Sequence, residues 1–83
     1  MYSVKKKATS IAETMIAVYK GLPLVYIEGE NKAFFRPSDG GYEVVFYSRN
    51  AQTALWVASK DSVILWITEK FFKGGEVVYY YTS

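Results

Sequence analysis

The side chains that most often carry acid–base and metal chemistry are missing from this sequence. Its 83 residues include neither cysteine nor histidine, which removes thiol nucleophiles, disulfides, and the commonest general base and metal ligand. The eight carboxylates are scattered, and the nearest pair, Glu28 and Glu30, lies at an expected hairpin end where both should be solvated. Paired acid and base catalysis needs one carboxylate that burial has shifted. We therefore expect no enzyme activity, no metal site and no cofactor.

The glycine pairs do not form a phosphate-binding loop. Gly40-Gly41 and Gly74-Gly75 fit neither the GxxxxGKS/T nor the GxGxxG pattern. We interpret the first pair as part of a turn and the second as the end of a helix.

Aromatic residues are the first candidates for binding, since they make up 18% of the chain. Tyrosine combines a large apolar body with a polar tip, which favours interfaces. We predict a partner-binding patch that consists of Tyr79, Tyr80, Tyr81 and Trp66. The simpler interpretation is that the tyrosines fill the core and rim of a small sheet, because aromatic residues are enriched in strands.

Basic residues form the alternative candidate site, for nucleic acid. They are Lys5, Lys6, Lys7, Arg36 and Arg49, with sheet tyrosines as stacking platforms for bases. A net charge of +2 is small for a dedicated nucleic-acid-binding protein. The lysine run could equally belong to a solvated leader or protect the edge strand of a sheet.

The first element that must position these residues is a helix that starts at Ser10. Ser10 and Glu13 have the spacing of a capping box, while Gly21 and Pro23 stop the helix. The apolar residues at helical spacing are Ile11, Ala12, Met15, Ile16 and Tyr19. We expect this face to be buried, so that Ile16→Asp would unfold the domain.

Strands follow the helix. Leu24–Glu28 and Ala33–Arg36 are rich in β-branched and aromatic residues and predict a hairpin around residues 29–32. Pro37–Gly41 predicts a loop. Tyr42–Tyr47 has apolar residues on both faces, which is typical of a central strand.

The segment Asn50–Lys73 allows two interpretations, one long helix or a strand followed by a helix. We favour a strand Thr53–Ala58 and a helix that begins near Asp61, because polar residues 59–62 interrupt the apolar pattern. The residues expected to face the core are Val63, Ile64, Ile67 and Phe71, with Leu65 and Trp66 on the opposite side. Glu76–Tyr81 predicts a last strand.

These elements predict one α+β domain over residues 1–83, with two helices and an antiparallel or mixed sheet of four to five strands. The alternative is a ferredoxin-like βαββαβ order, which requires a strand at Met1–Lys7 and a wholly helical Asn50–Lys73.

Two stretches of the chain resemble small bacteriophage-encoded anti-defence proteins. The first is Glu13–Phe35, with the sequence ETMIAVYKGLPLVYIEGENKAFF, and the second is Ser62–Tyr80, SVILWITEKFFKGGEVVYY. Some proteins of this helix–hairpin–helix–strand layout inhibit Thoeris immunity by sequestering a cyclic nucleotide signal. The resemblance implies a phage protein that inhibits host defence. Thr14 stands where the pattern has alanine, and we transfer no ligand-binding residue.

We therefore expect a small non-enzymatic protein, phage- or virus-encoded, that inhibits a host defence factor by occupying a protein partner. The alternatives are a nucleic-acid-binding protein and a homo-oligomer that sequesters a nucleotide between its subunits. The surplus of apolar residues favours a homo-oligomer. Because no apolar run approaches the roughly 20 residues of a membrane helix, and no signal-peptide pattern follows the first lysines, we expect a cytoplasmic protein without a membrane partner.

Overall fold

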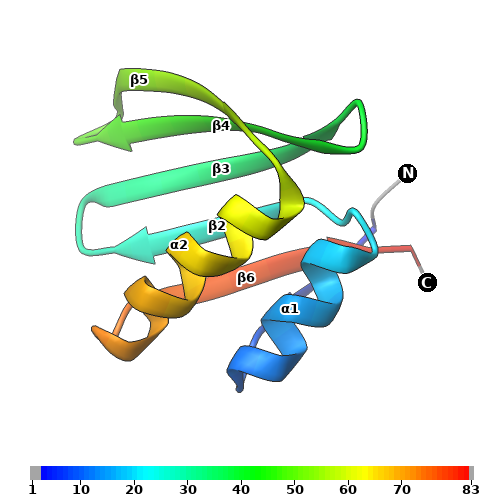
Figure 1. Cartoon of the computed structure of the whole chain (residues 1–83). Coiled ribbons are helices and arrows are strands. Elements are labelled where there is room, and N and C mark those ends of the chain that lie inside the picture. The colour runs from blue at the N-terminus through cyan, green and yellow to red at the C-terminus, as the bar shows by residue number, and fades with distance from the viewer. Residues whose placement is uncertain (1–2, 83) are drawn as a thin grey trace.

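The structure is a computed structural model that describes residues 3–82, with the side chain of Phe72 left out (Figure 1). The element bounds are β1 Val4–Lys7, α1 Ile11–Tyr19, β2 Leu24–Glu28, β3 Asn31–Ser38, β4 Gly41–Ser48, β5 Ala51–Ala58, α2 Lys60–Phe72 and β6 Glu76–Tyr81. Met1 and Tyr2, the start of the first expected strand, lie outside the described residues. Within residues 3–82, neither helix has the length and apolar character needed to span a bilayer.

The strands form one sheet of six strands in the order β1-β6-β2-β3-β4-β5. Every neighbouring pair is antiparallel. The α+β class, the two helices and the antiparallel alternative for the sheet are confirmed, whereas the expected number of four to five strands is wrong. The ferredoxin-like order is not confirmed, because the residues Ala51–Ala58 form β5 instead of extending a helix.

Three tight turns connect β2 to β5. Asp39 and Gly40 have φ angles of 49° and 80°, and Arg49 and Asn50 have φ angles of 52° and 67°. In these two turns, two successive left-handed residues match the twist of the strands that they join, and the first turn has one left-handed residue, Gly29, with a φ angle of 59°. In all three turns only two residues separate the strands. The predicted loops at residues 29–32 and 37–41 are therefore too long.

Helix α1 begins as predicted but buries a different face. The Ser10 side chain accepts a hydrogen bond from the Glu13 amide at 3.1 Å. The buried residues of the helix are Thr14, Ala17 and Val18, whereas Ile16 is 55% exposed. The predicted core face is wrong, because small residues let the helix lie close to the sheet and to α2, and the longer side chains point outward.

Helix α2 is capped by Ser59, two residues before the expected Asp61. Val63 and Ile67 are buried in the core, as predicted. Leu65 is 74% exposed, also as predicted, but Trp66 packs into the core instead of lying on the outer side. Its ring centroid lies 5.2 Å from that of Tyr26 and 5.8 Å from that of Phe46, in edge-to-face geometry.

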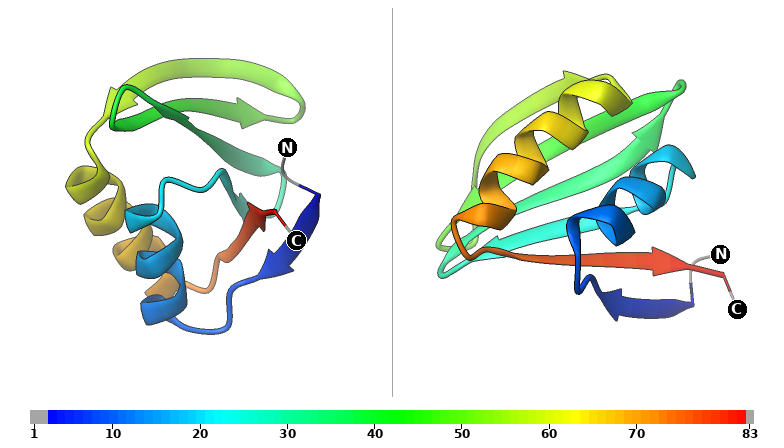
Figure 2. Two further views of the ribbon diagram at one scale, coloured as in Figure 1. Left: turned by 90° about the vertical axis from the view of Figure 1, so that its right-hand side faces the viewer. Right: turned by 60° about the horizontal axis from the view of Figure 1, so that its bottom comes forward.

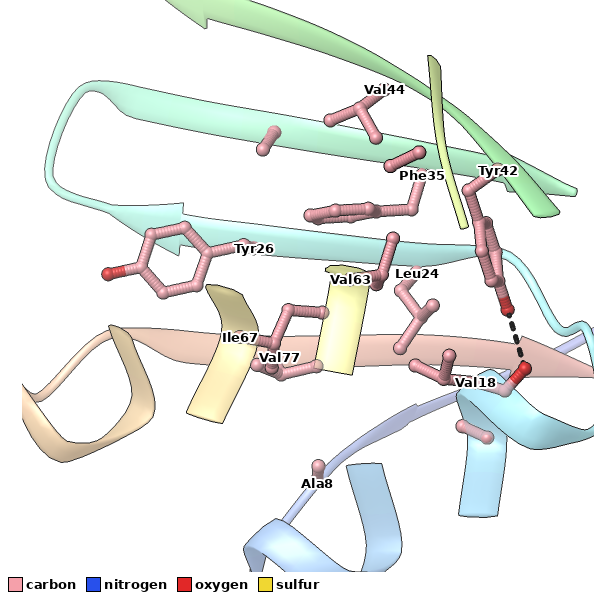
Figure 3. Close-up of a cluster of buried hydrophobic side chains, with 13 residues drawn as sticks. Ala8, Val18, Leu24, Tyr26, Phe35, Tyr42, Val44, Val63, Ile67 and Val77 are labelled. Atoms are coloured by element: carbon pink, nitrogen blue, oxygen red, sulfur yellow. Dashed lines mark hydrogen bonds between the residues drawn. The ribbon is translucent and has the colours of Figure 1, made fainter. Parts of the chain in front are cut away.

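The core lies between the two helices and one face of the sheet (Figure 3). Tyr42 of β4 is fully buried, and its hydroxyl donates to the carbonyl oxygens of Leu22 at 2.7 Å and Val18 at 3.3 Å. These bonds connect the sheet to the end of α1 and to the segment that follows it. Figure 2 shows from two further directions that both helices lie on the same side of the sheet.

Candidate functional site

The candidate site is the face of the sheet that lies opposite the two helices. Because directly paired residues of neighbouring strands point to the same side, the pairing defines a row across the sheet. That row is Lys7, Val78, Val25, Phe34, Val45 and Leu55, one residue from each strand. Five consecutive members are apolar, so a continuous apolar stripe crosses five strands.

Residues on either side of this row extend the same face. One flanking row is Glu76, Ile27, Lys32, Tyr47 and Gln52, and the other side holds Lys5, Tyr80, Arg36, Glu43 and Val57. We call all these residues together the uncovered face, because among residues 3–82 both helices lie on the other side.

Several apolar side chains of the uncovered face are open to solvent. Phe34 is 41% exposed, Leu55 60% and Val57 76%. Phe34 also packs edge-to-face against Tyr47, with ring centroids 5.3 Å apart, which holds both rings in place. Contiguous exposed apolar residues of this kind mark interaction surfaces more often than scattered ones do.

Charged residues flank the apolar stripe, except at its end in β5. Lys7 pairs with Glu76 at 3.2 Å, and Arg36 pairs with Glu43. Lys5 and Lys32 add two further positive charges to the same face. The uncovered face therefore has a positively charged rim with an excess of basic over acidic side chains.

The predicted aromatic patch does not lie on one surface. Tyr79 and Tyr81 point to the helix side, with ring centroids 6.0 Å apart. Tyr80 lies between them in the sequence and points to the uncovered face, where it pairs with Lys5. Trp66 belongs to the aromatic core. Of these four residues, only Tyr80 shares the uncovered face.

The basic residues proposed for nucleic acid are also divided. Lys5, Lys7 and Arg36 lie on the uncovered face. Lys6 points to the helix side, where it contacts Glu13, and Arg49 lies in the turn after β4, where its Nε contacts Glu30 at 3.1 Å. Carboxylates thus neutralise four of these five residues.

Glu13 forms the most highly connected polar cluster. One carboxylate oxygen accepts from the amide and hydroxyl of Thr9 at 2.8 and 3.0 Å, and the other accepts from the Lys6 ammonium and the Tyr79 hydroxyl, each at 2.5 Å. Lys6 makes the largest contribution to lowering the pKa of Glu13 to about 2. The bond to Glu13 is also the main reason that the pKa of Tyr79 is raised. A carboxylate so fully bonded and ionised suits a role in joining β1, α1 and β6 better than a role in proton transfer.

We expect acid to weaken the fold through Glu13. Its folded pKa lies below the ordinary value of 4.5, so its contribution is present above pH 4.5 and is lost as the pH falls toward 2. Melting temperatures measured across this range should fall less steeply for Glu13→Gln than for the wild type. Glu69→Gln, at an exposed site on α2, is the control. Equal acid dependence of the wild type and Glu13→Gln would contradict the assignment.

A pocket of about 280 Å³ opens on the helix side between α2 and the sheet. Tyr26, Phe46 and Trp66 line it, and the Lys70 ammonium lies 5.5 Å from the Trp66 ring centroid. The Tyr26 hydroxyl donates a hydrogen bond to Glu28 at 2.6 Å. Burial makes the largest contribution to raising the pKa of Tyr26 to about 12, and this hydrogen bond makes the second largest. The walls of the pocket are aromatic rings that pack at the edge of the core, and we assign the pocket no ligand.

No protein-family model, curated protein or solved structure matches this chain. Among the described residues, no three carboxylates are grouped as metal ligands would be.

Sequence reasoning did not identify the centre of the uncovered face. Phe34 and Val45 have the alternation of a strand that is apolar on both sides, and this signal was available. The decisive information is which side the helices cover, and this depends on the order of strands in the sheet.

Proposed function

We propose that this chain is a non-enzymatic binding protein that occupies a partner protein through its uncovered face. The observation that carries the proposal is the apolar stripe through Phe34 and Val45, which ends at the exposed Leu55. A partner that removes the side chains of Phe34 and Leu55 from water stabilises the complex, because burial of apolar surface is favourable.

The charges specify the chemistry of the partner. An apolar centre with a rim of Lys5, Lys32 and the paired Arg36 is complementary to a surface that has an apolar centre and an acidic rim. That the partner is a host defence factor stays a prediction, which rests on the sequence resemblance.

The central experiment compares two lysine substitutions at exposed apolar residues on opposite sides of the molecule. Phe34→Lys changes the uncovered face, whereas Leu65→Lys changes the outer side of α2. Wild type and both variants are immobilised and exposed to an extract of cells that express the gene, and the captured protein is then purified and titrated. We expect Leu65→Lys to bind like the wild type and Phe34→Lys to raise Kd about 30-fold or more, as for an aromatic hot spot worth about 2 kcal/mol.

Equal binding by wild type and Phe34→Lys would overturn the proposal. Circular dichroism must show that both variants remain folded, which we expect because both positions are exposed.

Nucleic acid is the second candidate, because Phe34, Tyr47 and Tyr80 share the uncovered face with Lys5 and Lys32. Rings of this kind can stack bases, and lysines can contact phosphates. The exposed aliphatic residues Leu55 and Val57 favour a protein instead. Titration with a labelled single-stranded oligonucleotide separates the two, since nucleic-acid binding would weaken steeply with added salt.

A further inference from the structure

The two edges of the sheet differ in the way that decides whether an edge can pair. The β1 edge is four residues long and contains Lys5, Lys6 and Lys7. The β5 edge, Ala51–Ala58, is eight residues long and contains neither a charged residue nor a proline. Lysines and short length are the usual protection of an edge strand against pairing, so β1 is protected and β5 lacks these features.

Strand β5 also exposes apolar side chains on both of its sides. Leu55 and Val57 point to the uncovered face, and Trp56, which is 40% exposed, points to the helix side. Figure 1 shows β5 at the outer border of the sheet, next to β4. An edge that is apolar on both sides is suited to a neighbouring strand of the same character.

The regular part of this edge is long enough to pair. A register shift between Phe46 and Tyr47 of β4 places a bulge near Thr53 of β5. A bulge distorts the edge locally, but from Ala54 to Ala58 each residue pairs regularly with β4.

We propose that the outer edge of β5 pairs antiparallel with β5 of a second copy across a two-fold axis, which joins the two six-stranded sheets into one. The axis at Trp56 places apolar residues opposite each other at three successive positions. Leu55 then lies opposite Val57 of the other copy on the uncovered face, and the two Trp56 side chains are neighbours on the helix side.

The absence of charge in β5 is what makes a second copy the fitting occupant. Two β5 strands can approach without bringing like charges together, whereas two β1 strands would place lysines opposite lysines. Pairing β5 with β1 of another copy would be head-to-tail and would leave an edge open at each end. The two-fold pairing uses the open β5 edge of both copies. The joined sheet then ends at the lysine-protected β1 edge of each copy.

This inference goes beyond the proposed function, which needs only one copy. Its first test is analytical ultracentrifugation of the wild type, the double variant Leu55→Lys/Val57→Lys and Phe34→Lys. In the double variant, lysines of the two copies face each other, at positions exposed enough to keep the fold. We expect a wild-type dimer, a rise of at least about tenfold in the dimer dissociation constant for the double variant, and a dimer for Phe34→Lys.

A monomeric wild type, or a dimer that the double variant does not weaken, would overturn the proposal. Because Phe34→Lys tests partner binding and leaves the β5 edge intact, the two proposals fail in distinguishable ways. Loss of partner binding by Phe34→Lys with a monomeric wild type would retain the first proposal and remove the second.

A distance measurement provides a second test, since the chain contains no cysteine and single cysteines can be spin-labelled specifically. With the axis at Trp56, the two Ala54 Cα atoms lie roughly 15 Å apart, from about 3.4 Å per residue and about 4.8 Å between strands. Labels at Ala54→Cys should therefore be close, and labels at Lys5→Cys on the distant β1 edges several times farther apart. A shorter distance at position 5 than at position 54 would contradict pairing through β5.

Discussion

Val18→Asp is expected to unfold the domain, whereas Ile16→Asp should change the free energy of unfolding by no more than about 0.5 kcal/mol. The two residues are close in the same helix, yet Val18 is fully buried and Ile16 is 55% exposed. An unpaired charge at position 18 costs about 3 to 5 kcal/mol, and loss of the buried valine side chain costs about 1.5 to 3 kcal/mol more. A domain of this length has only about 4 to 12 kcal/mol of stability in total.

Circular dichroism melts of the two variants at neutral pH make this comparison. The wild type and Ile16→Asp should melt at nearly the same temperature, and Val18→Asp should show no cooperative transition. The opposite order would mean that α1 presents to the core the face predicted from the sequence alone.

Phe35→Ala should lower the free energy of unfolding by about 3 to 5 kcal/mol, and Phe34→Ala by about 1 kcal/mol or less. Phe35 lies in the core, where its ring centroid is 5.7 Å from that of Trp66 and 6.4 Å from that of Tyr42. Its neighbour Phe34 points to the uncovered face and already contacts water. Truncation at position 35 leaves a cavity, while truncation at position 34 removes only a partly buried ring.

Urea denaturation of the two variants measures this difference directly. The pair forms its own control, because composition and strand are the same and only the side of the sheet differs. Equal destabilisation by Phe34→Ala and Phe35→Ala would show that both faces of β3 are buried in solution. In a monomer this result would contradict the fold.

Local chemistry explains which parts of the fold could be predicted. The cap at Ser10 and the stop at Gly21 depend on neighbouring residues alone, and the bounds Glu76–Tyr81 follow from one glycine pair and one run of strand-forming residues. The core positions Val63 and Ile67 of α2 follow from their spacing, because residues four apart lie on the same face of a helix.

The face of α1 depends on tertiary packing. The apolar residues of α1 lie on several sides of the helix. The face of Ile11, Met15 and Tyr19 therefore competes with the face of Thr14, Ala17 and Val18 for burial in the core. Close packing against α2 favours the smaller side chains. No periodicity in the sequence contains this information.

The candidate site depends on topology for the same reason. The alternation of Tyr79, Tyr80 and Tyr81 was readable, but which of them faces solvent depends on the side chosen by both helices. The apolar stripe through Phe34 and Leu55 likewise becomes a surface only when both connections, through α1 and through α2, lie on the other side.

The position of β6 between β1 and β2 has a consequence for biosynthesis. Of the described strands, β6 leaves the ribosome last, yet it is the strand with which β1 pairs. The meander β2 to β5 uses only neighbouring strands and can form on the nascent chain, because its contacts are local. Strand β1 must wait for β6, so the backbone N–H and C=O groups of Val4–Lys7 that pair with β6 stay accessible to chaperones until that strand has been made.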